Sequence, residues 1–458
     1  MIFRAVMVKV TKNPWCRFAA LLILLAGIGG VTLSAQDASA APSRPITLEE
    51  AIRRAQANEP GYAAAEAGAS TARLDRATAR TAALPTVQLH NQGLYTQPNG
   101  LTNQAGQGTG NQPSPRFVAN NAVREYASQG MVNESLGLGQ VAEIRRTGAA
   151  SLRAAAEQEI ARRGLVVAVT GLYFGVTASE KRVAIAEQAH EEAANFLRLT
   201  GNREQAREAA HADVLKAELE EQQRTRELSD ARLAAERARL ELGVLLFADP
   251  RTPYTVVAAK DAGPLASRPE VEQAAAKNNP ELKRALAALE ESDAEVLAAR
   301  AAYLPSLGLN YTYGIDAPQF AVKGPDKARN LGYSASVTLD IPVWDWLSTE
   351  RKLKQSKMER DVARVSLSAA QREAIARLDE AYSEAEAARD QLSSLDASAR
   401  TAEESLRLTK LRYTAGECTV LEVVDAQASY VTSENAREDG KVRYQTALAS
   451  LQTLAGSL

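Results

Sequence analysis

Apolar side chains alternate with small polar ones in two segments of the second half of the chain. The apolar positions are Leu307, Leu309, Tyr311, Tyr313 and Ile315 in one segment and Leu331, Tyr333, Ala335, Val337, Leu339 and Ile341 in the other. A period of two predicts strands, and each segment has the roughly ten residues that cross a bilayer. We predict strands at about 306–315 and 331–341. The alternation fits equally well a hairpin that packs one face on a soluble core.

Two tryptophans follow the second predicted strand. Trp344 and Trp346 lie just past its end, where membrane proteins place a belt of aromatic side chains at the lipid headgroups. If the strands cross a bilayer, we expect both residues to be membrane-interface aromatics.

The first half of the chain carries a weaker version of the pattern. Val87 and Leu89 alternate with polar residues, but Asn91 and Gly93 interrupt the apolar face. The segment 117–132 has no clean phase. We predict strands at about 86–95 and 117–132 because of the internal repeat described below.

Long stretches without proline mark the helical parts. The 17 prolines leave gaps at 116–249 and 343–458. Proline is excluded from helix interiors, so each gap permits helices, and each is long enough to require a fold back. Apolar residues recur at helical spacing in patches: Leu165, Val169, Leu172 and Val176; Ala370, Ala374, Leu378 and Ala381; Tyr444, Leu448 and Leu451. A helix over about 138–200 spans about 90 Å and needs packing neighbours along its length.

The chain also repeats. Asn-x-Pro and Leu-Pro recur 220 residues apart, at Asn58–Pro60 and Asn278–Pro280 and at Leu84-Pro85 and Leu304-Pro305. Leu-Arg-Leu-Thr recurs 209 residues apart, at Leu197–Thr200 and Leu406–Thr409. Two copies of one unit explain both offsets, with extra residues in the first copy at its longer loop, 96–116.

Each copy is predicted to contain a helix, two strands and a long helical hairpin. The first copy is 41–247, with its hairpin at about 138–247. The second is 268–458, with its hairpin at about 346–456, and 248–267 connects the two. The N-terminal helices are expected at about 47–82, opened by a capping box of Thr47 and Glu50, and at about 268–302.

The N-terminus is typical of a secretory signal peptide. Basic residues precede an apolar run, 18–35, and Ala38-Ser39-Ala40 supplies a cleavage site. We predict removal of residues 1–40, with a cut after Ala35 and a retained anchor as alternatives. No other apolar run reaches spanning length, so the mature protein is periplasmic, secreted or an outer-membrane β-barrel.

Catalytic and metal-binding patterns are missing from the sequence. The three histidines form no HExxH or Cys/His cluster, and there is no P-loop or GxSxG motif. The formal net charge of −2, with interspersed signs, gives no nucleic-acid signal. We therefore expect no enzyme, no cofactor and no metal site. After cleavage Cys418 is the only cysteine, and a packing role is favoured over a reactive thiol.

The segment 406–430 is predicted to reverse the second hairpin. Gly416 stands where the chain turns, because glycine tolerates the left-handed conformation that ends helices. A helix then starts near Thr419 and carries Glu422 and Asp425, three residues apart and hence on one face.

These features together resemble the TolC-type outer-membrane efflux proteins. The resemblance rests on the signal peptide, on Ile46–Ala51 at the start of the first helix, on the duplicated Asn-x-Pro and Leu-Pro, and on LRYTAGECTVLEVVDAQ. It implies a homotrimer in the outer membrane of a Gram-negative bacterium. Each subunit would give four strands to a 12-stranded barrel and four helical segments to a periplasmic α-helical barrel.

The resemblance also implies roles for residues near the hairpin turns. Glu422 and Asp425 match acidic positions that face the lumen near a constriction, Arg412 and Gly416 lie at the turn that meets a periplasmic adaptor, and Tyr413 matches a tip tyrosine that contacts the position of Asp213. Three copies of the acids would form negative rings. Position 207 is Arg where the second turn has Gly416, so the first turn is expected to be built differently.

The function that follows is a passive exit duct, gated at the helical tips, for an inner-membrane pump and its adaptor. Three alternatives stay open. The chain could be a soluble periplasmic coiled-coil scaffold, or the same channel could serve type I protein secretion or metal export rather than drug efflux.

Overall fold

The computed structural model describes residues 45–95, 124–257, 263–317, 320–324, 327 and 329–456. The predicted signal peptide, the loop 96–116 and the first part of the second predicted strand, 117–123, lie outside these residues. The elements below belong to one unit, Pro45–Leu458, which is described by itself.

The described elements follow the same order twice. The first half has α2 (Leu48–Asn58), α3 (Pro60–Thr81), β2 (Thr86–Tyr95), β3 (Arg124–Leu136), α4 (Leu138–Gln205) and α5 (His211–Leu246). The second half has α6 (Arg268–Asn278), α7 (Pro280–Ala301), β5 (Ser306–Ala317), β6 (Leu331–Asp340), α8 (Ser348–Thr414) and α9 (Val420–Ala455). Two short strands, β1 (Pro45–Ile46) and β4 (Thr255–Val256), pair in parallel. The architecture is thus mainly helical with a β part.

The N-terminal helix of each half is broken, where one continuous helix was expected. Glu59 and Asn279 leave the helical conformation, with ψ of 117° and 116°, and Pro60 and Pro280 each begin a second helix. The ring of proline clashes with a helical conformation at the residue before it, and proline suits the first helical turn. Asn279 Oδ1 accepts a hydrogen bond from the amide of Glu281 at 2.9 Å and so caps α7.

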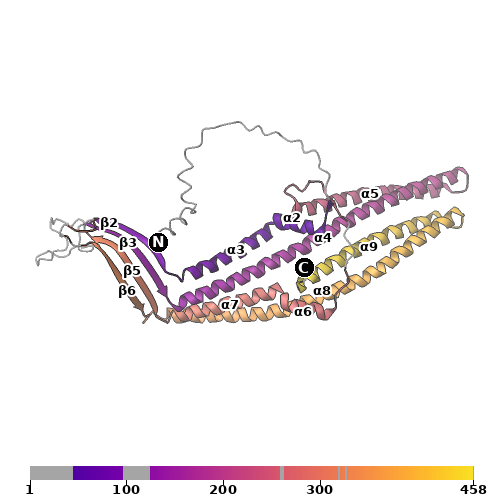
Figure 1. Cartoon of the computed structure of the whole chain (residues 1–458). Coiled ribbons are helices and arrows are strands. Elements are labelled where there is room, and N and C mark those ends of the chain that lie inside the picture. Colours follow the sequence, from indigo (N-terminus) through magenta and orange to yellow (C-terminus); the bar gives the residue numbers. More distant parts are fainter. Residues whose placement is uncertain are drawn as a thin grey trace, which may run out of the picture. The chain divides into compact units, whose positions relative to one another are not determined.

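Four strands form one antiparallel sheet in the order β2-β3-β5-β6 (Figure 1). The sheet lies beyond one end of the long helices, and no described helix covers either face. Its outer strands, β2 and β6, each have one edge without a partner among the described strands. The register places the alternating apolar residues of neighbouring strands on one face, for example Val87 opposite Val132 and Tyr313 opposite Tyr333.

The polar interruption of β2 is matched across the sheet. Asn91 pairs with Ser128 in the register, and the Ser128 hydroxyl donates to Asn91 Oδ1 at 2.8 Å. Each side chain therefore gives the other a hydrogen-bond partner on a face that is otherwise largely apolar. This pairing explains how Asn91 is accommodated on that face of the strand.

The long helices form a layer in which α8 lies at one edge. α4 packs against α3, α5, α7 and α9, whereas α8 packs against α7 and α9 (Figure 1). α4 has 68 residues, which corresponds to a length of about 100 Å. By length and composition alone α4 could cross a membrane, whereas the sequence was expected to hold no spanning segment besides the N-terminal one. Its apolar residues Val169, Tyr173 and Val176 are instead buried in a core with α2 and α5.

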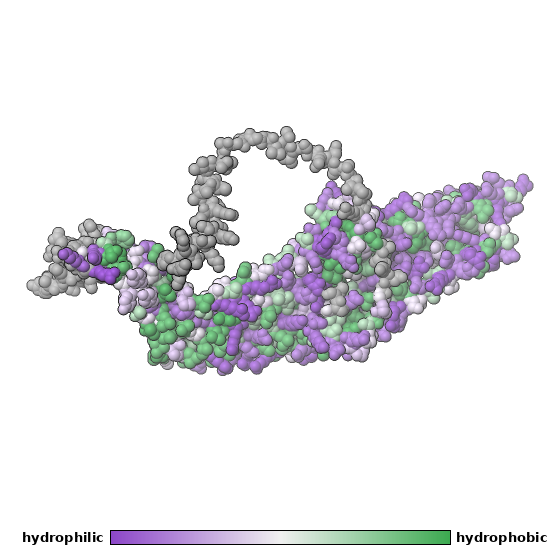
Figure 2. Space-filling model, in the orientation of Figure 1, coloured by the Kyte–Doolittle hydropathy of each residue, from purple (hydrophilic) through white to green (hydrophobic). Residues whose placement is uncertain are grey.

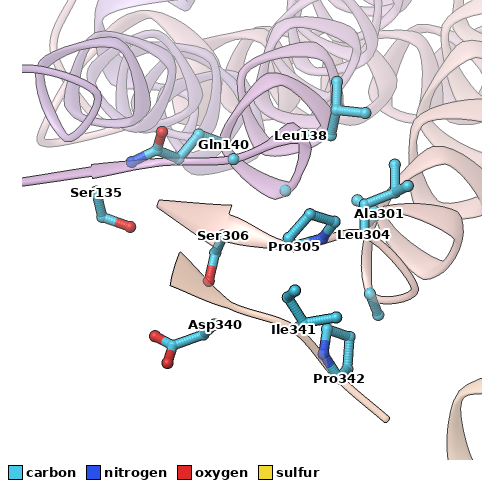
Figure 3. A pocket seen from close by; sticks show the side chains of 14 residues that line it. Ser135, Leu138, Gln140, Ala301, Leu304, Pro305, Ser306, Asp340, Ile341 and Pro342 are labelled. Carbon is cyan, nitrogen blue, oxygen red and sulfur yellow. The ribbon is translucent and has the colours of Figure 1, made fainter. Parts of the chain in front are cut away.

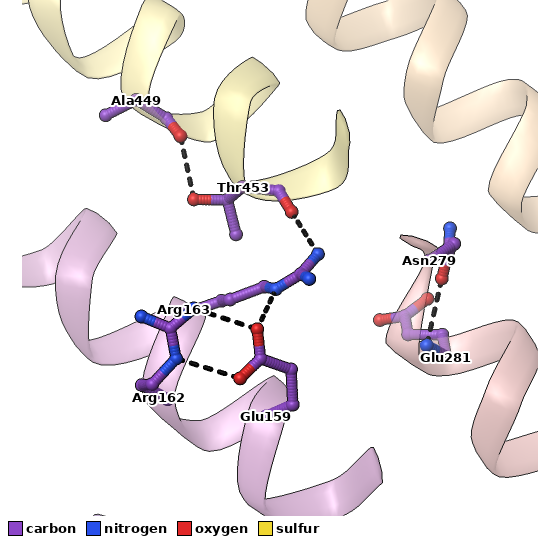
Figure 4. Close-up of polar contacts among 7 residues, drawn as sticks. All are labelled: Glu159, Arg162, Arg163, Asn279, Glu281, Ala449 and Thr453. Carbon is purple, nitrogen blue, oxygen red and sulfur yellow. Dashed lines mark hydrogen bonds and ion pairs between the residues drawn. The ribbon is translucent and has the colours of Figure 1, made fainter. Parts of the chain in front are cut away.

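Polar contacts join the C-terminal end of α9 to α4 (Figure 4). Arg163 is buried and donates to the carbonyl of Thr453 and to Glu159, both at 2.6 Å. A positive charge at the end of a helix complements its dipole. Hydrogen bonding from Arg162, with a further contribution from Arg163, lowers the pKa of Glu159 to about 2. The two halves of the chain are thus tied together at this point.

Candidate functional site

The candidate site is the pair of turns between the long helices. We call residues 203–213 the first tip and residues 412–422 the second tip; the two segments correspond at the offset of 209. Figure 1 shows both turns at the same end of the unit, opposite the sheet.

The second tip ends α8 with a Schellman turn. The amide of Glu417 donates to Arg412 O at 2.9 Å and the amide of Gly416 donates to Tyr413 O at 3.0 Å. Gly416 has φ of +80°, the left-handed conformation that this turn needs. Glycine adopts it readily because it has no Cβ.

The first tip is built in the same way, which corrects the expectation from Arg207. The amide of Glu208 donates to Arg203 O at 2.7 Å and that of Arg207 donates to Glu204 O at 2.8 Å. Arg207 itself takes the left-handed conformation, with φ of 64°. A non-glycine residue adopts it at a cost of about 1–2 kcal/mol, so the hydrogen bonds of the turn outweigh that strain.

Glu422 acts in the second tip as a helix cap. Its carboxylate accepts from the Thr419 amide at 3.1 Å, and Arg412 Nη1 lies 3.4 Å from its other oxygen. The backbone hydrogen bond from Thr419 lowers the pKa of Glu422, and Arg412 contributes less. Asp425, one turn later, is exposed. The two predicted acids therefore differ, because the charge of Glu422 is already paired within its own tip.

Tyr413 is buried between the hairpins. Its hydroxyl lies 3.3 Å from Thr200 Oγ1, and the Thr200 hydroxyl donates to Phe196 O at 2.9 Å, which leaves Tyr413 as the donor. Its ring centroid is 5.0 Å from that of Phe196. Among the hydrogen bonds of the described residues, Tyr413 has Thr200 as partner and not the predicted Asp213.

Arg203, in the last turn of α4, reaches across to the end of α8. Nη1 donates to Tyr413 O and Nη2 to Thr414 O, both at 2.8 Å. Its Cζ also lies 4.7 Å from the centroid of the Tyr413 ring. The corresponding residue of the second tip, Arg412, bonds within its own turn, to Glu417 O at 3.2 Å. Sequence reasoning missed Arg203, because its partners are backbone carbonyls that leave no trace in residue types.

The remaining tip residues contribute less to the contact between hairpins. Asp213 lies in the first turn of α5, which has no side-chain cap at Ala210. The Cys418 thiol donates to Thr409 O at 3.4 Å, and burial raises its pKa, which disfavours the reactive thiolate. Cys418 therefore fits the packing role expected for it.

The sheet end carries the other predicted residues. Trp344 and Trp346 are exposed after β6, with ring centroids 5.9 Å apart. A pocket of about 610 Å³ lies nearby, where the sheet meets the helices (Figure 3). Ser135, Ser306 and Asp340 give it a polar side, whereas Leu138, Leu304 and Ile341 give it an apolar one. No group of three potential metal ligands is found in the described part of the chain.

Comparison with known proteins gives three consistent findings. The family model described as "Outer membrane efflux protein" matches residues 271–457. Outer membrane protein OprJ of Pseudomonas aeruginosa is 27% identical over 175 residues, 38% of this chain and 36% of OprJ. Proteases secretion protein PrtF of Dickeya chrysanthemi is 28% identical over 190 residues, 40% of this chain and 40% of PrtF.

The fold is shared over a longer stretch than the sequence. The CmeC outer membrane channel of Campylobacter jejuni has a TM-score of 0.72 at 17% identity, covering 94% of this chain and 93% of CmeC. The sequence matches, in contrast, span about two fifths of the length of OprJ and PrtF. Residues 271–457 therefore match the outer membrane efflux protein family by sequence, and nearly the whole chain shares the fold of the CmeC channel.

Proposed function

We propose that three copies of this chain form an outer-membrane channel that is the passive exit duct of a tripartite export system. The sheet of each copy contributes four strands to a 12-stranded barrel, and the long helices form a periplasmic α-helical barrel. An adaptor protein and an inner-membrane pump supply the cargo and the energy.

The observation that carries this proposal is a sheet with uncovered faces and two open edges. Val87 is 77% exposed and Tyr333 is 76% exposed, although both belong to the largely apolar face. In water such a face is unfavourable, and unpaired edges invite pairing with another chain. Lipid against the apolar face, with closure of β6 on the β2 of the next copy, resolves both problems.

The helical layer supports the same arrangement. Met358, Val362 and Val365 on α8 are all more than half exposed, as is Leu74 on α3, and these helices lie at the layer's edges. Figure 2 shows hydrophobic side chains gathered over the helices next to the sheet, whereas the hairpin ends are mostly hydrophilic. Fully burying an exposed side chain of this size contributes about 1.5–3 kcal/mol, and each of these residues gains part of that against a neighbouring copy.

A soluble coiled-coil scaffold is a poorer account, because the described helices leave the sheet bare. The cargo is a separate matter. PrtF is named for protease secretion, so a role in type I protein secretion stands beside drug efflux as a second candidate. Comparing secreted protein and antibiotic tolerance in a strain lacking this chain distinguishes the two.

The proposal is tested by reconstituting the purified protein in a planar lipid bilayer. We expect discrete conductance steps and an oligomer of three chains in detergent. Recovery of the signal-processed protein in the soluble fraction, without detergent and without conductance, would refute the proposal.

A further inference from the structure

We propose that Arg203 is the clamp that holds the two hairpin tips together in the resting state. The inference rests on the proposed function, since it assigns the residue that keeps the periplasmic end of the channel closed. Arg203 would act as a positioning residue: it fixes the end of α8 and does not touch the cargo.

The geometry of Arg203 is that of a two-point attachment. Its two terminal nitrogens donate to adjacent carbonyls, Tyr413 O and Thr414 O, at 2.8 Å each. These carbonyls belong to the last turn of α8, which carries partial negative charge; Tyr413 O also accepts from the Gly416 amide, and the second lone pair of its oxygen is open to Arg203. A guanidinium fork satisfies both acceptors at once, which the single ammonium group of lysine does less well.

The aromatic ring of Tyr413 completes the clamp. Arg203 Cζ lies 4.7 Å from the ring centroid, within the range of a cation–π contact. Phe196 and Thr200 hold the ring from the α4 side. The ring is thus enclosed by three residues of α4, and a movement of α8 away from α4 would have to break all of these contacts.

The internal repeat shows that this contact is specific to one tip. Arg412 occupies the equivalent position in the second tip, but it bonds to Glu417 O and Glu422 of the same turn. One arginine therefore stabilises its own turn, and the other connects two hairpins. Because the acceptors of Arg203 are backbone atoms, its two hydrogen bonds do not depend on which side chains stand at 413 and 414.

Other ties between the hairpins lie further from the tips. Lys410 Nζ is 2.6 Å from Glu192, and Arg182 pairs with Asp439. All four side chains are partly exposed to solvent, so water and salt weaken these pairs. Arg203 differs from them because it joins the ends of the helices and stacks on a buried ring.

The first test measures gating in planar bilayers with the full-length trimer. We compare the wild type, Arg203→Ala, Arg203→Lys and Arg207→Ala, the last of which removes an exposed guanidinium from the same tip. We expect Arg203→Ala to raise the fraction of time in the open state about tenfold, equivalent to about 1.4 kcal/mol. Arg203→Lys should lie between the wild type and Arg203→Ala, and Arg207→Ala should match the wild type.

The outcomes separate this inference from the proposed function. If the wild type conducts and Arg203→Ala gates like Arg207→Ala, Arg203 is not the clamp, although the channel stands. If no variant conducts, including the wild type, the proposed function fails and the clamp fails with it. If Arg203→Ala does not assemble, Arg203→Lys is judged by the same comparison with Arg207→Ala.

A second test does not depend on conductance. Amide hydrogen exchange at Gly416 and Glu417 reports the opening of the second tip, whereas Arg203 belongs to the first tip. We expect Arg203→Ala to speed exchange at both tips and Arg207→Ala to leave the second tip unchanged. Unchanged exchange at the second tip in Arg203→Ala would overturn the inference.

Discussion

Arg207 offers a direct measure of the strain stored in the first tip. It holds φ of 64°, whereas its counterpart Gly416 reaches φ of +80° without a side chain. Replacing Arg207 with Gly removes a left-handed strain of about 1–2 kcal/mol. The added freedom of glycine in the unfolded chain takes back about 0.5–1 kcal/mol. With the two terms taken at matching ends of their ranges, the turn should become more stable by about 0.5–1 kcal/mol.

The assay must be local, because thermal unfolding of the whole protein does not report the opening of one turn. The Glu208 amide donates to Arg203 O, so its hydrogen exchange follows the opening of the turn. A gain of 0.5–1 kcal/mol slows exchange there about two- to fivefold. The reverse change, Gly416→Ala, should speed exchange at Glu417 by a similar factor.

The control is Arg207→Ala, which removes the side chain but keeps a Cβ in the left-handed conformation. Its exchange at Glu208 should stay near that of the wild type. Equal slowing in Arg207→Ala and Arg207→Gly would show that the side chain, and not the backbone conformation, is responsible, and would refute the reasoning.

Three further predictions concern the tips and the C-terminal end of α9. Glu422→Ala should speed amide exchange in the first turn of α9 at neutral pH, whereas Glu422→Gln, which still caps the helix, should not. Because the pKa of Glu422 is lowered in the folded state, the wild-type cap is complete above the ordinary pKa of 4.5. The cap is lost as the pH falls through the lower folded-state pKa. Asp425→Asn should reduce the preference of the channel for cations more than Glu422→Gln does, since Arg412 already pairs with Glu422; equal effects in reversal-potential measurements would contradict this. Gly456→Ala should destabilise the protein by at least about 1 kcal/mol in thermal unfolding, because the added Cβ would lie 2.5 Å from Asn278 Cβ. The control Gly68→Ala should not destabilise the protein, because a Cβ added there has no atom within 4 Å.

Strands were predicted best where the alternation of apolar and polar residues is complete within one segment of the chain. The alternation of Leu309, Tyr311 and Tyr313 is visible in β5 alone, because successive side chains of a strand point to opposite faces whatever the neighbouring strand is. In β2 the same face contains Asn91, and its partner Ser128 is 37 residues away. The residue pattern of one strand does not reveal a partner on another strand, so the strands of the first half were harder to predict.

The contacts of the tips depended on geometry that residue types do not encode. Arg207 was expected to exclude the glycine-type turn, but two backbone hydrogen bonds hold the turn in spite of the strain. Tyr413 was predicted to contact Asp213, but its hydroxyl partner in the structure is Thr200. Arg203 donates to carbonyls, which every residue has, so no motif marks it.

The helix breaks at Pro60 and Pro280 were within reach of the sequence. Both prolines mark the repeat, and the prediction of one continuous helix through each of them is wrong. The conformational restriction of the residue before proline was sufficient to place a break at Glu59 and at Asn279. Here the physical rule was the better guide than the length of the helical pattern.

The most direct test of the central claim asks whether the open edges of the sheet meet in neighbouring copies. In a Cys418→Ser background, one cysteine is placed in the middle of β6, at Ser336, and a second is scanned along β2 at positions such as Gln88, His90 and Gln92. The account predicts that at least one pair oxidises to a disulfide in the membrane and gives covalent dimers and trimers, with no larger species. No cross-link at any position along β2, or a ladder that continues past three chains, would contradict a closed channel of three copies.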